Sequence, residues 1–142
     1  MNTVLIPKKF QEKISSGLAY PAILGNENGS AIADASTGLE FEITNNIGDD
    51  ILVTSLSLGF DIAYTKALIE IKNTQQNRFI VSGSVQLGAI GTPNTTKSTC
   101  NSELEIVPFI LKSGQYVQVF ISNSLGVSIP AKSISLSLNG LQ

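Results

Sequence analysis

The sequence contains no histidine and no tryptophan, and its 142 residues include one cysteine and one methionine. Without histidine, the chain cannot form Ser–His or Cys–His nucleophile pairs, and it lacks the commonest ligand of transition metals. One thiol, Cys100, excludes an intramolecular disulfide, so we expect folding in a reducing cytoplasm. Because Cys100 lies in a predicted loop of Thr, Ser and Asn without an imidazole, we expect an inert thiol.

Charge and long apolar runs are also scarce. Charged residues make up 14% of the chain, the formal net charge is −2, and the largest basic cluster is Lys8-Lys9. Nucleic-acid binding needs a basic surface to neutralise phosphates, so we do not predict it. No apolar run approaches the ~20 residues that cross a bilayer. Val4–Ile6 is followed at once by Pro7, so we expect neither a membrane span nor a signal peptide.

Most of the polar residues are short and uncharged. The sequence has 17 Ser, 10 Thr, 11 Asn and 7 Gln beside 42% hydrophobic residues. Burying a hydroxyl costs far less than burying a charge, so this composition is typical of exposed sheet faces and subunit contacts. The length suits one domain, or one domain with an arm.

Apolar and polar residues alternate most clearly in Leu39–Leu58. A period of two predicts a half-buried strand, since successive side chains point to opposite faces of a sheet. The first strand is predicted to bury three apolar residues, namely Leu39, Phe41 and Ile43. The turn-forming residues 45–50 then separate it from a second strand, Ile51–Leu58.

The same pattern predicts further strands up to Asn139. Their expected ranges are Gly59–Tyr64, Ala67–Lys72, Arg78–Leu87, Ser102–Leu111, Gln115–Ser122 and Ser133–Asn139. Gly83 suggests a bulge or a close approach of another backbone, and Pro108 suggests an edge strand or a bend. The compact turn Lys112–Gly114 predicts a hairpin between the strands on either side of it.

Residues 1–38 differ from the rest. Pro7–Ser16 is predicted to be a short helix that Gly17 ends, and Gly25–Ser30 reads as a loop. This segment could be an arm that docks on a neighbouring subunit, or it could cover one end of its own domain. The overall prediction is an all-β chain: an antiparallel β-sandwich, most simply a jelly roll, over Leu39–Gln142, with an N-terminal extension over residues 1–38.

Three groups of residues raise the question of a chemical site. Asp49 and Asp50 with Asn45 and Asn46 could offer oxygen ligands to calcium, although such a turn also favours Asx residues on its own. The paired carboxylates could serve a glycoside hydrolase or simply face solvent; these pairs are Glu40 with Glu42 and Glu103 with Glu105. Tyr116 and Phe120 could stack on a ligand or pack against another sheet or subunit. We predict no catalytic, cofactor-binding or metal-binding residue, and no enzyme.

Two stretches carry a family resemblance, LEFEITNNIGDDILVTSLSLG (39–59) and SELEIVPFILKSGQYVQVFISNS (102–124). The chain resembles small bacteriophage virion proteins of the vertex (penton) and capsid-decoration type, which are built on jelly rolls or related sandwiches. The resemblance implies a non-enzymatic structural component of a virus particle, made in the host cytoplasm, that contacts itself as a homo-oligomer and other virion proteins.

Two alternatives remain at this point. The first is a glycan-binding or adhesin module whose loop around Gly91–Asn101 presents the ligand, and the second is a carboxylate-dependent hydrolase. If the structural role holds, the apolar residues outside the predicted strands are the expected association surface. They are Val4, Leu5, Ile6, Phe10, Leu18, Tyr20, Ile23 and Leu24.

Overall fold

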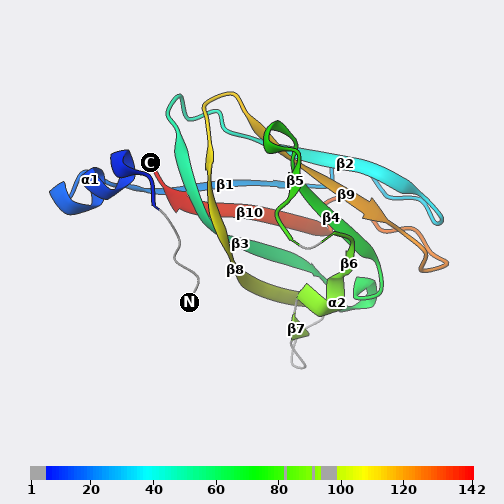
Figure 1. Cartoon of the computed structure of the whole chain (residues 1–142). Helices are drawn as coiled ribbons and strands as arrows, with labels where there is room; N and C mark the ends of the chain where they lie inside the picture. The colour runs from blue at the N-terminus through cyan, green and yellow to red at the C-terminus, as the bar shows by residue number, and fades with distance from the viewer. Residues whose placement is uncertain (1–5, 82, 91, 94–98) are drawn as a thin grey trace.

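Two antiparallel sheets packed face to face form the fold of the computed structural model, which describes residues 6–81, 83–90, 92–93 and 99–142 (Figure 1). The first sheet has the order β1 (Pro21–Glu27), β10 (Ile134–Leu141), β3 (Ile51–Asp61), β8 (Thr99–Leu111) and β7 (Thr92–Pro93). The second has the order β2 (Thr37–Thr44), β9 (Tyr116–Ser122), β4 (Leu68–Asn73) and β5 (Arg78–Phe79), with β6 (Val85–Gln86) also paired to β4. The predicted antiparallel sandwich is confirmed.

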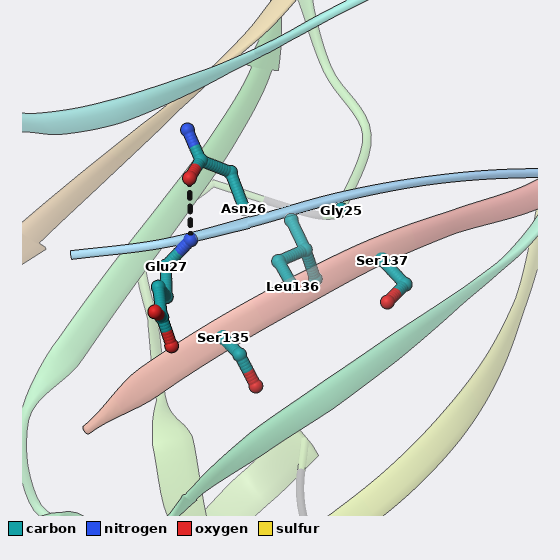
Figure 2. Close-up of a pocket in the computed structure, with 6 residues that line it drawn as sticks. All are labelled: Gly25, Asn26, Glu27, Ser135, Leu136 and Ser137. Carbon is teal, nitrogen blue, oxygen red and sulfur yellow. Dashed lines mark hydrogen bonds between the residues drawn. The ribbon is translucent and has the colours of Figure 1, made fainter. Parts of the chain in front are cut away.

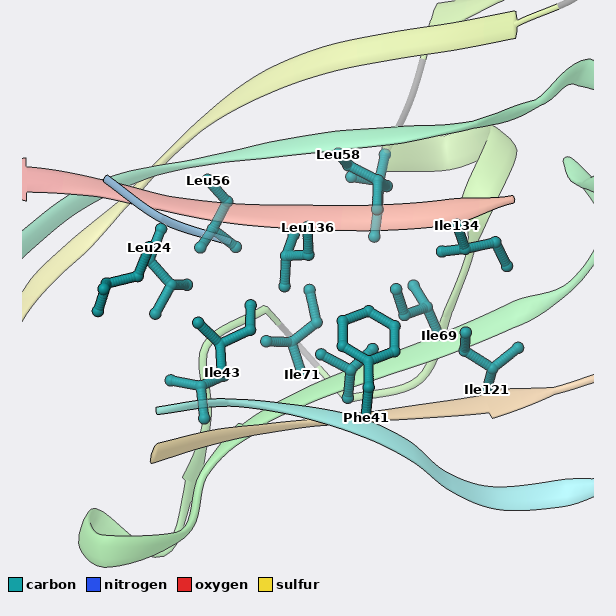
Figure 3. Packing of buried hydrophobic residues seen from close by; sticks show 14 of the residues in the cluster. Leu24, Phe41, Ile43, Leu56, Leu58, Ile69, Ile71, Ile121, Ile134 and Leu136 are labelled. Atoms are coloured by element: carbon teal, nitrogen blue, oxygen red, sulfur yellow. The ribbon is translucent and has the colours of Figure 1, made fainter. Parts of the chain in front are cut away.

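The core lies between the two sheets. Figure 3 shows that side chains of β1, β3 and β10 point toward side chains of β2, β4 and β9. Fully buried members from both layers include Leu56, Ile69, Ile71, Ile121 and Ile134. The period-two pattern of the sequence produces this arrangement, because the strands turn an apolar face inward and a mostly polar face outward.

The predicted hairpin around Lys112–Gly114 is wrong. β8 pairs with β3 and β7, whereas β9 pairs with β2 and β4, so the turn carries the chain from one sheet to the other. The same holds for the turn between β2 and β3. A tight turn reverses the chain in both cases, but the turn residues do not determine whether the next strand joins the same sheet or the opposite one.

The predicted strand Arg78–Leu87 is also wrong as a continuous element. Its ends form the two-residue strands β5 and β6, and Leu87 begins the short helix α2 (Leu87–Ile90). Gly83 adopts a φ of 68°, and nothing lies within 4 Å of where its Cβ would be. It therefore serves a left-handed backbone position and not a close approach of another backbone. The predicted strand Gly59–Tyr64 is wrong as a separate element, because residues 59–61 end β3 and a 3-10 turn (Ile62–Tyr64) follows. A second 3-10 turn (Thr74–Gln76) follows β4.

Shifts in the pairing register adjust the predicted faces. The pairing of β2 with β9 shifts between Leu39 and Phe41, so Leu39 is 45% exposed while Phe41 and Ile43 are buried. The predicted burial of Leu39 is therefore wrong, because one extra residue in the strand rotates its side chain outward. In β8 the pairing with β3 shifts near Pro108. The irregularity lies where the sequence predicts an edge strand or a bend.

The N-terminal residues join the sandwich earlier than expected. The predicted helix is confirmed as α1 (Lys8–Ser16), and Gly17 ends it in the left-handed conformation. The boundary at Leu39 is placed too late, because β1 belongs to the first sheet and pairs along its whole length with β10. Pro21 starts this strand, where its missing N–H does no harm, and Gly25 lies inside it. Neither α1 nor α2 is long and apolar enough to cross a membrane, and these are the helices of the described residues.

Buried asparagines fasten the loops at the ends of the sandwich. Asn45 and Asn123 each follow a strand of the second sheet and each precede a left-handed glycine by three residues. The Nδ2 atom of Asn45 donates to the carbonyl oxygens of Asp49 at 2.7 Å and Leu111 at 2.9 Å. Its Oδ1 atom accepts from the backbone N–H two residues on. Asn123 repeats this arrangement, and Asn28 holds the turn before β10 in a similar way.

Candidate interaction surface

The acidic turn proposed as a calcium ligand set is occupied by lysines of α1. The Nζ atom of Lys9 lies 2.9 Å from a carboxylate oxygen of Asp50, and that of Lys13 lies 3.7 Å from Asp49. The hydrogen bond from Lys9 lowers the pKa of Asp50. The side-chain amide of Asn45 is bonded to backbone groups. The two carboxylates of the turn bind lysines of α1, so the turn holds this helix against the sandwich. In the described part of the chain, no three His, Cys, Asp or Glu side chains gather where they could hold a metal ion.

The paired carboxylates do not face each other across a cleft. Glu40 and Glu42 belong to β2 in the second sheet, whereas Glu103 and Glu105 belong to β8 in the first. Burial raises the pKa of Glu40. Glu103 accepts a hydrogen bond from the Ser55 hydroxyl at 3.3 Å, and the side chain of Glu105 lies outside the described residues.

The cysteine and the loop that precedes it are described only in part. The backbone of Cys100 belongs to β8 and pairs with Phe60 and Pro93. It therefore lies in a strand and not in the predicted loop, while its side chain is outside the described residues. Most of the loop Gly91–Asn101, proposed to present a glycan, is likewise not described.

Tyr116 and Phe120 lie half-buried on the outer face of the second sheet. On that face the Nζ atom of Lys72 lies 4.8 Å from the ring centre of Phe79 and 5.1 Å from that of Phe120. Lys72 also lies 3.4 Å from a carboxylate oxygen of Glu70, and a hydrogen bond from a serine hydroxyl lowers the pKa of Glu70. The Lys72 ammonium group therefore lies over the rings of Phe79 and Phe120, an arrangement that attracts a positive charge.

The apolar residues of the N-terminal segment divide into two groups. Phe10 and Leu24 are buried within this chain, at 0% and 8% exposure. Leu18 and Tyr20 remain 60% exposed and Ile23 70%. Val4 and Leu5 lie outside the described residues, and Ile6 is half-buried. The segment therefore packs on its own sheet through one set of side chains and presents a second set to solvent.

The β1 edge, meaning the side of β1 that faces away from β10, carries unpaired backbone groups. Tyr20 and Gln142 exchange two backbone hydrogen bonds, and the N–H of Asn28 donates to Ile134. In an antiparallel ladder the bonded residues alternate, so Ile23 and Gly25 direct their N–H and C=O groups outward. No described residue accepts a hydrogen bond from either N–H.

A hollow adjoins this edge on the outer face of the first sheet. Figure 2 shows its lining, with the side chains of Ser135 and Ser137 on one side of β10 and Gly25 beside them on β1. Its volume is about 340 Å³. The missing side chain at Gly25 is what leaves this space open, since both neighbouring serines are small.

A second hollow separates β1 from β2. It is lined by residues of both strands, including Leu24, Ile43 and Thr44. Among the described residues, one hydrogen bond crosses between the two strands here, from the Nδ2 atom of Asn26 to the carbonyl oxygen of Glu42 at 2.8 Å. The Oδ1 atom of Asn26 accepts from the N–H of Glu27.

The remaining sheet edges of the described chain are each protected. β7 is two residues long, contains Pro93 and pairs only with Cys100 and Asn101. The rest of that side of β8 carries Glu103, Pro108 and a shift in register. β5 is two residues long and contains Arg78. β2 is interrupted by its bulge and carries Glu40 and Glu42. Short strands, proline, bulges and charges are the devices that prevent edge-to-edge association. β1 has seven residues in unbroken register and no charge before Glu27, so it lacks these devices except for its first residue.

The β1 edge, Asn26 and the position of Lys72 were not predicted from the sequence. The predicted loop Gly25–Ser30 is wrong in its first three residues, because Gly25–Glu27 belong to β1. No protein-family model matches the chain, and no curated protein matches it either.

Proposed function

We propose that this chain is a jelly-roll structural subunit of a virus particle that works through contacts with other subunits. The strand order supports the fold assignment. Strands β1, β10, β3 and β8 face strands β2, β9, β4 and β5, and the chain passes from one sheet to the other between most consecutive strands. Apart from the short strands β6 and β7, the four remaining strands of each sheet have the order expected of a jelly roll, an architecture common in capsid proteins.

The composition of the outer faces supports a role in contacts. Ser55, Ser57, Ser135, Ser137 and Asn139 share the outer face of the first sheet. Asn139 donates to the hydroxyls of Ser55 and Ser57 at 3.3 and 2.8 Å. Glu103 brings one carboxylate to this face, where it is bonded to Ser55. Covering the remaining hydroxyl and amide groups would cost less desolvation than covering a charged surface.

The exposed apolar side chains of the N-terminal segment support the same role. Leu18, Tyr20 and Ile23 are at least 60% exposed, although they follow a helix that is already docked. Contact with a neighbouring subunit would bury these side chains and gain about 25 cal/mol of binding free energy per Å² of apolar area. The entropy lost when the segment becomes ordered at the interface reduces this gain. These three exposed side chains are therefore the expected contact with a neighbouring subunit.

Composition of purified particles tests this proposal. Particles from a culture that makes this chain are banded on a density gradient, and their proteins are quantified by mass spectrometry. We expect the chain to band with the major capsid protein at a fixed stoichiometry. Recovery of the chain only in the soluble fraction would contradict the proposal.

Glycan binding is a second candidate, because lectins also use jelly rolls and the same strand order supports both readings. In this role the loop Thr92–Asn101 would present the ligand. Binding on a glycan array that disappears when this loop is replaced by a short Gly-Ser linker would favour this candidate.

A further inference from the structure

We infer that the β1 edge is a self-association site at which β1 pairs antiparallel with β1 of a second copy of this chain. The inference deepens the proposed function by naming the surface and its partner. It starts from the contrast between β1 and the other described edges, which are short, bulged or charged. Unprotected edges of regular strands are templates for pairing with another chain.

The available backbone groups select one register. The outward N–H groups on β1 belong to Ile23 and Gly25, because Pro21 has none and the N–H of Glu27 is bonded to Asn26. A two-fold axis at the position of Leu24 places Ile23 of each copy opposite Gly25 of the other. Each such pair exchanges two hydrogen bonds, so all four outward donors find acceptors. The ladder then stops at Pro21 and Glu27, where no further donor exists.

The side chains fit the same register. Residues directly opposite each other in a ladder lie on the same face of the sheet, so Ile23 of one copy stands beside Gly25 of the second copy. The hollow of about 340 Å³ on that face is lined by Gly25, Asn26, Glu27, Ser135, Leu136 and Ser137. Ile23, which is 70% exposed in one copy, would cover this hollow and lose its contact with water (Figure 2). The side chain of Leu24 stays in its own core.

Few residues take part, so the isolated dimer is expected to be weak. Interfaces below about 1,200 Å² in total are typical of transient complexes. In a shell that offers many simultaneous contacts, a weak pairing adds avidity without making the free chain insoluble. The dimer therefore has to be measured at high concentration.

Sedimentation velocity over about 1 µM to 1 mM, with the full chain, tests the pairing. We expect a concentration-dependent monomer–dimer equilibrium. Ile23→Lys should raise the dissociation constant at least about tenfold, because it puts a charge at the centre of the contact. Val107→Lys is the matched control: it is 71% exposed on β8 and should leave the equilibrium unchanged.

Hydrogen exchange of the amides gives an independent readout. The N–H groups of Ile23 and Gly25 should exchange more slowly as the protein concentration rises, whereas the N–H of Gly29 should not respond. A wild-type chain that stays monomeric throughout overturns the pairing and leaves the virion proposal untouched. A dimer that Ile23→Lys does not weaken also overturns it. A chain that pairs through β1 but is missing from purified particles supports the pairing and contradicts only the virion role.

Discussion

Replacing the buried Asn45 by alanine should destabilise the sandwich by about 3 kcal/mol. The side chain is 0% exposed, and it makes three hydrogen bonds of 2.7, 2.9 and 3.1 Å to backbone groups of Asp49, Leu111 and Ile47. Each such bond contributes about 1 kcal/mol net, and leaving a buried carbonyl unpaired adds a desolvation penalty. The backbone bonds of residue 45 to Gln115 and Gly114 are kept in the variant, so they do not enter this value.

Urea unfolding followed by circular dichroism measures the difference. Asn46→Ala is the matched control, because the adjacent asparagine is exposed and donates no side-chain hydrogen bond among the described residues. We expect the control to change the free energy of unfolding by less than about 0.5 kcal/mol. For a chain of this size, the loss at Asn45 corresponds to a fall of roughly 10 °C in Tm.

Asn45→Asp removes the hydrogen-bond donor of this side chain and keeps its size. The carboxylate is the same size but cannot donate, and it would face the carbonyl oxygens of Asp49 and Leu111. We expect a loss at neutral pH at least as large as that of the alanine variant. Equal stabilities of the wild type, Asn45→Ala and Asn45→Asp would refute the reasoning, because the buried amide would then contribute nothing.

Three further predictions concern the backbone and the docking of α1. Ala35 has a φ of 62°, so Ala35→Gly should raise the free energy of unfolding by about 0.5 kcal/mol, whereas Ala33→Gly should lower it by a similar amount; chemical denaturation compares the two. A Cβ at Gly140 would overlap a backbone oxygen of β3, so Gly140→Ala should destabilise by more than about 3 kcal/mol, and a wild-type denaturation midpoint would contradict this. The pKa of Asp50 is lowered in the folded chain, so its contribution is present above about pH 4 and is lost as the pH falls through the lowered pKa. Lys9→Met should therefore be less stable than the wild type at neutral pH and equal to it in strong acid; a difference that persists in acid would point to another cause.

The sequence predicts those elements whose signals are local. Alternation located β3, β9 and β10, and the Pro7 and Gly17 signals located α1. β1 was missed because Pro21 and Gly25 hide a short alternation of buried Ala22 and Leu24. Its partner β10 lies more than 100 residues away, so no local pattern could reveal the pairing.

The candidate surface was harder to predict than the fold. Asn45 and Asn46 look alike in the sequence, yet only tertiary contacts decide which is buried. A signal did exist, because the pattern Asn-x-[Ile/Leu]-Gly occurs at residues 45–48 and again at 123–126. Exposed Ile23 and buried Leu24 are likewise indistinguishable by composition, since the strand position alone sets their faces.

The pairing of β1 with β10 also fixes the order of events during synthesis. β1 leaves the ribosome roughly 100 residues before β10, which at about 5–20 residues per second is a delay of roughly 5–20 s. Throughout this interval both sides of β1 lack a partner strand, because β10 separates it from β3 in the finished sheet. The first sheet consequently closes only after β10 emerges. Nascent chains on the same messenger would meet with their β1 strands exposed before either has folded.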